Sequence, residues 1–128
     1  MNILAAVFID SIDTRSVAGP STRIDLSGIQ FSMASPGPVP VSIEPHLCVI
    51  VHCPEGSRNT AALEVVYWRG EEQIARNVQP LEVEPGKFNY RLVRAQLEFD
   101  DYGIIEAHCR IDLGPPHVVP FTLLPPVS

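Results

Sequence analysis

The chain of 128 residues is long enough for one domain, residues 1–128, with a hydrophobic core of its own. Apolar residues make up 45% of the chain, which argues against disorder, and its 13 prolines, about twice the usual share of roughly 5%, argue against long helices. Fifteen acidic and nine basic residues give a formal charge of −6 without a basic cluster, so we expect no nucleic-acid partner.

The N-terminal segment is apolar but short. Its apolar run, residues 3–9, follows no Lys or Arg and meets Asp10 and Asp13 instead of a small-residue cleavage site. It therefore predicts a first strand, residues 2–12, covered on both faces, and not an export signal. No run approaches the ~20 residues of a membrane helix. With three cysteines, an odd number typical of reduced thiols, we expect a cytoplasmic protein without a membrane partner.

Turns and prolines divide the next part of the chain. Ala18-Gly19-Pro20 predicts a turn, and residues 22–33 predict a second strand in which the apolar parity changes at Gly28. A glycine at such a change indicates a β-bulge. Residues 35–45 contain four prolines in eleven residues, which predicts an extended surface crossover.

Alternating patterns predict strands through the middle of the chain. In residues 46–53 the side chains of Leu47, Val49, Val51 and Cys53 share one face. Residues 61–68 alternate in the same way, and the turn at residues 69–72 predicts a hairpin with residues 73–78. A further short strand is predicted at residues 81–84, before a turn at Pro85-Gly86.

Residues 88–99 carry a conflict of parity. Phe88, Tyr90 and Leu92 agree with one another, whereas Val93 and the apolar residues after it take the other parity. If apolar side chains all point inward, a bulge near Leu92 and Val93 is needed to reconcile the two halves.

The longest regular alternation lies in residues 105–113, after a turn at Asp101-Tyr102-Gly103. Alternate apolar residues predict the buried face: Ile105, Ala107, Cys109, Ile111 and Leu113. Residues 118–124 predict the last strand, and Pro120 within it indicates an edge or an interruption. Eight or nine short strands separated by regular turns are typical of an antiparallel β-sandwich.

The turn at residues 101–103, leading into the penultimate strand, resembles that of immunoglobulin-like domains, although Ile105 and Ala107 replace their usual tyrosine and cysteine. From about Ala5 to Leu124 the chain resembles a group of small bacterial proteins that share an immunoglobulin-like domain of unknown function. The features that carry this resemblance are the opening hairpin with Gly28, the strand ending in residues 51–54, the hairpin at residues 68–73, and residues 101–112. The resemblance implies an all-β, antiparallel immunoglobulin-like β-sandwich and no assigned activity.

Two His-Cys pairs are the strongest candidates for chemistry. His52-Cys53 and His108-Cys109 supply a zinc-like ligand set, but adjacent residues on a strand point to opposite faces, so we expect no metal site. Cys53 and Cys109 share inward faces and are either bridged or, as we favour, buried free thiols. Cys48 lies roughly 13 Å along a strand from His52, too far for a nucleophile and its base. We therefore expect neither an enzyme nor a cofactor.

An apolar outward face is the remaining candidate site. Ile50, Val66 and Trp68 are apolar where solvent is expected, which indicates a protein–protein interaction face unless residues 35–45 cover it. The sequence thus favours a non-catalytic interaction module that binds a protein partner or forms a homodimer anchored by Trp68. The alternative is a sandwich that binds a small ligand or carbohydrate through Trp68, Tyr67 and acidic loops.

Overall fold

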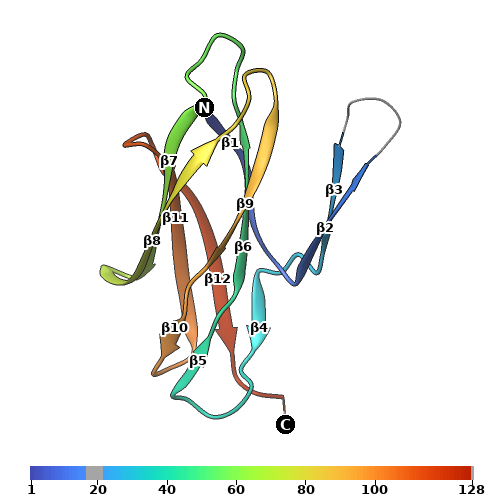
Figure 1. The fold of residues 1–128 in the computed structure, drawn as a ribbon. Helices are drawn as coiled ribbons and strands as arrows, with labels where there is room; N and C mark the ends of the chain where they lie inside the picture. The colour runs from blue at the N-terminus through green and yellow to red at the C-terminus, as the bar shows by residue number, and fades with distance from the viewer. Residues whose placement is uncertain (17–21, 128) are drawn as a thin grey trace.

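The computed structural model describes residues 1–16 and 22–127, so the predicted turn at Ala18-Gly19-Pro20 lies outside the described residues (Figure 1). The described residues form strands and no helix, and hence no helix that could cross a membrane. The strands are β1 (Asn2–Ile9), β2 (Ser11–Ser16), β3 (Thr22–Ser27), β4 (Ser32–Ala34), β5 (Val41–Ile43), β6 (His46–His52), β7 (Thr60–Arg69), β8 (Glu72–Glu82), β9 (Phe88–Arg94), β10 (Leu97–Phe99), β11 (Gly103–Ile111) and β12 (His117–Leu124).

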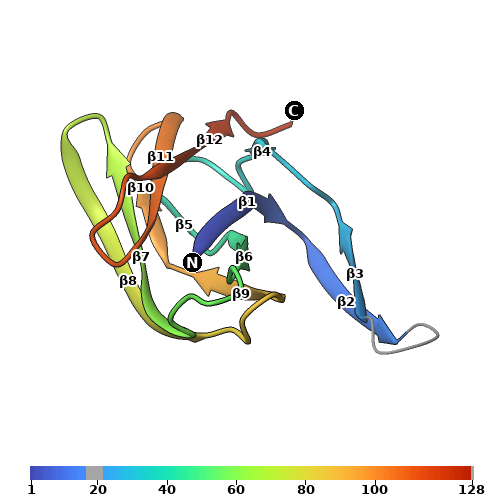
Figure 2. The ribbon, with the colours of Figure 1, turned by 90° about the horizontal axis from the view of Figure 1, so that it is seen from above.

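Two sheets pack face to face over one core (Figure 2). One is three-stranded, in the order β1-β6-β9, and the other is five-stranded, in the order β4-β12-β11-β7-β8. Their strand pairs are antiparallel except for β4 with β12, which is parallel. Two smaller two-stranded sheets, β5 with β10 and β2 with β3, complete the described fold.

The core between the sheets is built from alternate residues of facing strands, as the period-2 patterns predicted. Leu47, Val49 and Val51 from β6 face Leu63 and Val65 from β7, all at most 1% exposed. Each such side chain contributes roughly 1.5–3 kcal/mol through removal of apolar surface from water. The prediction of an all-β fold with antiparallel sheets is therefore confirmed.

Strand β11 lies between β7 and β12, and its predicted buried face is confirmed at Ile105, Ala107 and Cys109. The predicted extension to Leu113 is wrong, because Leu113 is 85% exposed. The strand ends at Ile111, and the next residue, Asp112, adopts a φ of 51°. There the Asp112 amide donates to the Ala62 carbonyl, and the Asp112 carboxylate accepts from the Ala62 amide at 3.0 Å. These bonds hold Asp112 against β7, and the Gly114 amide, which donates to the Ile111 carbonyl at 3.0 Å, closes the turn that follows.

The bulge predicted near Leu92 and Val93 is also wrong. The β6–β9 register runs without a shift from His46 opposite Arg94 to His52 opposite Phe88. The parity conflict is resolved in another way: Val93 points into the core, while Leu92 and the apolar residues of the same parity point outward.

The first predicted strand, residues 2–12, divides into β1 and β2 at Asp10. Its predicted cover on both faces is found at the end of β1, where the adjacent Phe8 and Ile9 are each 1% exposed, but not near its start, where Leu4 is 59% exposed beside a register shift between Ile3 and Ala5. The predicted strand at residues 22–33 likewise divides, at Gly28, into β3 and β4. Residues 81–84 do not form a separate strand, because β8 continues through Pro80 at the sheet edge, where its missing N–H has no partner strand.

The proline-rich crossover contains β5, which pairs with β10. Pro120 lies at a sheet edge, one of the two predicted settings, because β12 runs through it without a break and β4 pairs with β12 only from Thr122 to Leu124. Together β2 and β3 form a hairpin, here called the arm, which projects from the body (Figures 1 and 2).

Candidate interaction surface

The outward side of the three-stranded sheet is apolar across all three of its strands. Because Leu47, Val49 and Val51 of β6 point into the core, the alternate residues of β6 point away from it. The register places two apolar rows next to each other on this side. We call them the apolar face: Val7, Cys48 and Leu92 in one row, and Ala5, Ile50 and Tyr90 in the other.

An antiparallel sheet with one solvated side normally alternates between apolar inward and polar outward residues. The apolar face breaks this rule, since neither row contains a charged residue. Cys48 at its centre is fully buried, whereas Ile50 and Leu92 are partly exposed. Phe88, 48% exposed, extends the surface along β9. A contiguous apolar surface of this kind is typical of a site for another macromolecule.

The sequence contained a signal for this face in the shared parity of Phe88, Tyr90 and Leu92. The prediction of a bulge depends on the assumption that all apolar side chains point inward. The structure shows that the three side chains lie outward, opposite His52, Ile50 and Cys48 respectively.

The thiol in the centre of the apolar face is not a nucleophile. Burial removes water from Cys48 and raises the pKa of its thiol above the ordinary value of 9.0. At neutral pH the thiol is therefore protonated, and only the thiolate is reactive. Cys48 therefore packs here as a small, buried apolar side chain.

The arm carries a second apolar surface. Its register places Ile12 opposite Leu26 and Thr14 opposite Ile24, so these four side chains share one side of the hairpin. We call this side the arm stripe. Its three large residues are partly exposed and do not belong to the core between the sheets.

The other side of the arm is charged. Arg15 and Asp25 form an exposed ion pair there, with Nε and Oδ2 2.9 Å apart. A two-stranded hairpin is marginally stable by itself in water. With one apolar and one charged side, the arm has the amphipathic pattern of a hairpin that packs its apolar side against another apolar surface.

The base of the arm is held by backbone bonds. The Asp10 amide donates to the carbonyls of Ser27 and Gly28, at 3.0 and 3.1 Å, and the Gln30 amide donates to Phe8 at 2.9 Å. Gly28 has a φ of 69°, and a Cβ added there would lie 2.8 Å from the Asp10 Cβ and closer still to its carboxyl group. The glycine predicted as a bulge is therefore the residue at which the arm leaves the body.

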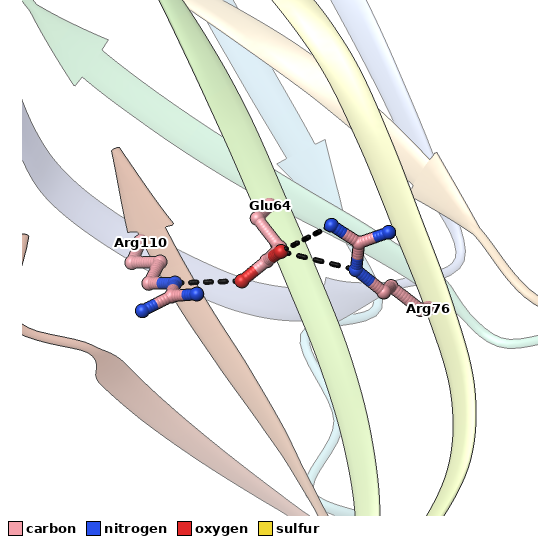
Figure 3. Close-up of polar contacts among 3 residues, drawn as sticks. All are labelled: Glu64, Arg76 and Arg110. Carbon is pink, nitrogen blue, oxygen red and sulfur yellow. Dashed lines mark hydrogen bonds and ion pairs between the residues drawn. The ribbon is translucent and has the colours of Figure 1, made fainter. Parts of the chain in front are cut away.

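The outward side of the five-stranded sheet is different, because charged side chains pair across it. Glu64 of β7 accepts from Arg76 of β8 at 2.7 Å and from Arg110 of β11 at 2.6 Å (Figure 3). Hydrogen bonds from the two guanidinium groups hold the pKa of the Glu64 carboxyl below its ordinary value. This side satisfies its own polar groups and ties three strands together.

Trp68 lies beside this network. Its ring centroid is 6.2 Å from that of His108, and both rings border a cavity of about 220 Å³ with Arg110 and Val66. That volume is below the roughly 300–1,000 Å³ usual for ligand pockets. Tyr67, the other aromatic residue proposed for a ligand, is fully buried, and burial raises the pKa of its hydroxyl. A ligand on this side therefore meets Trp68 and not Tyr67.

The three residues predicted as one interaction face are not brought together. Ile50 lies on the apolar face of the three-stranded sheet, whereas Val66 and Trp68 lie on β7 in the five-stranded sheet. The parity of each strand was correct, but the strands belong to opposite sheets, whose outward sides face away from each other. Residues 35–45 contribute β5 to a separate two-stranded sheet.

The two His-Cys pairs are placed as the face argument required. Cys53 and Cys109 are fully buried, while His52 and His108 are partly exposed on strands of different sheets. Within residues 1–16 and 22–127 no three His, Cys, Asp or Glu side chains gather as metal ligands. All three cysteines are free thiols, and burial raises the pKa of Cys109 to about 12.

Comparison with known proteins adds no relative. No family model, no curated protein and no solved structure matches the chain.

Proposed function

We propose that this protein is a non-catalytic interaction module that binds another protein chain through the apolar face. The observation that carries the proposal is the pair of adjacent rows, in register across three strands, that are apolar on the side of the sheet turned away from the core. A sheet whose side chains are apolar on both sides is typically buried on both sides, here against the core on one side and against a partner on the other.

The proposal includes an immunoglobulin-like β-sandwich. It is supported by a three-stranded sheet opposite a five-stranded one and by the parallel pairing of β4 with β12 at the edge. A turn that enters β11 through Gly103, at a φ of 145°, also supports it, with the Asp101 carboxylate accepting from the Tyr102 amide at 2.8 Å. A cytoplasmic location belongs to the same proposal, supported by the free thiols.

A second function rests on Trp68, which with His108 and Arg110 borders the small cavity of the other sheet. Aromatic and charged groups around a depression suit a small polar ligand such as a sugar. A titration of monosaccharides followed by Trp68 fluorescence tests it, and a saturable change at millimolar ligand would favour this function. We place it second because the cavity is small and Glu64 already occupies both neighbouring guanidinium groups.

Site-specific photo-crosslinking tests the interaction module. A photoreactive phenylalanine analogue placed at Ile50 reports on the apolar face, and the same analogue at Val78, exposed on the other sheet, is the matched control. In native host cells we expect a discrete protein adduct from position 50 and none from position 78. Equal adducts from both positions, or none from position 50, would refute the proposed function.

A further inference from the structure

We infer that the side chains of Asn89 and Arg91 close the free edge of β9 against an added β-strand, and that without them this edge pairs with the same edge of a second copy of the chain. The inference goes beyond the proposed function, because it concerns backbone groups at the edge of the three-stranded sheet and not the side chains on its outward side. It begins from the sheet order β1-β6-β9, in which β6 is the one strand of the described fold that pairs with β9.

A strand with one neighbour leaves alternate backbone groups without a partner strand. In an antiparallel pair the N–H and C=O of one residue point to the same side, so the residues of β9 alternate between bonding to β6 and facing away from it. The groups that face away form a row with which another chain can pair. The seven residues of β9, Phe88–Arg94, exceed the ~5–6 usual for a strand, so this row is long.

The row is interrupted near its centre, at Tyr90, by the side chains of the two flanking residues. The Tyr90 amide donates to Oδ1 of Asn89 at 2.8 Å, and Nη1 of Arg91 donates to the Tyr90 carbonyl at 3.2 Å. Because a side chain bonds each group, both groups face away from β6 and belong to the free edge. The donor and the acceptor that Tyr90 can offer to another strand are therefore already bonded within the chain.

The position of Arg91 fits this role. Arg91 shares its side of β9 with Val93, which is fully buried in the core. A partly buried guanidinium needs hydrogen-bond acceptors, and no carboxylate in the described part of the chain forms an ion pair with Arg91. The Tyr90 carbonyl supplies an acceptor. Charged residues that point inward at an edge strand are a known means of blocking strand addition.

The closure depends on these side chains because the chain does not fill the space beside them. A sheet edge can also be closed by a loop or helix that lies over it. Here a cavity of about 520 Å³ is bordered by Asn89 and Arg91 of β9 and by Glu82 and Val83 at the end of β8. An incoming strand consequently meets the two side chains first.

The edge of the other large sheet, at β8, is closed by different means. Pro80 lacks an N–H and cannot donate to an added strand. Asn77 and Gln79 are polar residues on the side of β8 that carries Leu81 into the core. Strand β9 contains no proline, so the bonds to Tyr90 take the place that the proline has in β8.

A second copy supplies a strand that matches the opened edge. Two antiparallel β9 strands related by a two-fold axis beside Tyr90 place the two Tyr90 residues opposite each other. Phe88 of one copy then lies opposite Leu92 of the other, an apolar cross-strand pair of the kind that stabilises sheets. Positions 89 and 91 lie opposite each other, so Arg91 does not meet its own charge.

Amide hydrogen exchange at Tyr90, measured by NMR on the full chain at about 20 µM and about 1 mM, tests the inference. In the double variant Asn89→Ala/Arg91→Ala, the two-fold pairing uses four released backbone groups. Each hydrogen bond contributes a factor of about 2–10 to an equilibrium constant, so edge association should tighten roughly 100-fold. Exchange at Tyr90 should therefore slow with concentration roughly fivefold or more beyond any slowing in the wild type.

Arg94→Ala is the matched control. It removes the same charge from an exposed position at the end of the same strand, and Arg94 bonds neither backbone group of Tyr90, so its exchange should follow the wild type. Asn89→Asp retains an acceptor for the Tyr90 amide and should also follow the wild type. Protected amides in β6 show that each variant is folded. If the double variant does not fold, Arg91→Ala alone should give a smaller change in the same direction.

Two results would overturn the inference. One is a folded double variant whose exchange at Tyr90 slows no more with concentration than that of the wild type, since the opened edge then attracts no strand. The other is an equal slowing in the double variant and in Arg94→Ala, since loss of charge, and not release of Tyr90, is then the cause. Photo-crosslinking from position 50 is independent of either result, because it reports on the apolar face.

Discussion

Replacement of Ala107 by aspartate tests the assignment of the core. Ala107 is fully buried in the middle of β11, directly between Tyr67 of β7 and Val119 of β12. A carboxyl group with an ordinary pKa near 3.9 must be kept protonated there at pH 7, which costs about 4 kcal/mol because each pKa unit is worth ~1.36 kcal/mol. Its lack of a hydrogen-bond partner adds about 1–3 kcal/mol. The expected loss of roughly 5–7 kcal/mol compares with a total stability of about 5–15 kcal/mol for a domain.

The loss should also depend on pH with a definite sign. The carboxyl in the folded state has a raised pKa, so the destabilisation grows as the pH rises above about 3.9 and is about 4 kcal/mol smaller at pH 4 than at pH 7. Urea denaturation followed by the fluorescence of Trp68, the single tryptophan, measures it at both pH values. Ile104→Asp, 57% exposed on the other side of the same strand, is the control and should cost less than about 1 kcal/mol. Equal losses in the two variants, or a loss that does not change with pH, would refute the reasoning.

Three further perturbations follow from the same structure. Gly28→Ala places a methyl group against Asp10 at the base of the arm, so amide hydrogen exchange should accelerate in β2 and β3 but not in β6 or β11. Gly37→Ala is the control and should leave exchange unchanged, because the space around Gly37 is open. The buried thiols should not react with an aromatic disulfide reagent in the native protein, and rapid labelling would contradict their burial. Burial raises the pKa of Cys48, and that of Cys109 to about 12, so the free energy of unfolding should also fall as the pH rises above 9.0. Since the pKa of Glu64 is lowered, its contribution to stability is present above pH 4.5 and lost as the pH falls below it. Glu64→Gln should therefore flatten the acid side of the curve of stability against pH. An unchanged curve would show that the two ion pairs do not contribute to stability.

The inward face of each strand could be predicted from the sequence because it depends on a period of two residues. That period placed Leu47, Val65 and Ile105 in the core, where the structure has them. The sheet to which a strand belongs depends on pairings between distant segments. His46–His52 pairs with Asn2–Ile9 and Phe88–Arg94, whereas the next strand, Thr60–Arg69, crosses to the other sheet. Ile50 and Trp68 were therefore assigned to the correct sides of their own strands and to the wrong common surface.

The local rule of parity failed in two places, at the arm and at the apolar face. Residues 22–33 change parity because the arm leaves the body at Gly28, and residues 88–99 change parity because β9 carries apolar side chains outward. Each conflict was first explained by a bulge, the device that preserves a single buried face. A strand with apolar residues on both sides needs no bulge if both sides are buried, one in the chain's own core and the other against a partner. A parity conflict without a register shift is thus itself an indication of a second dry surface, as expected where local rules and fold disagree at a functional site.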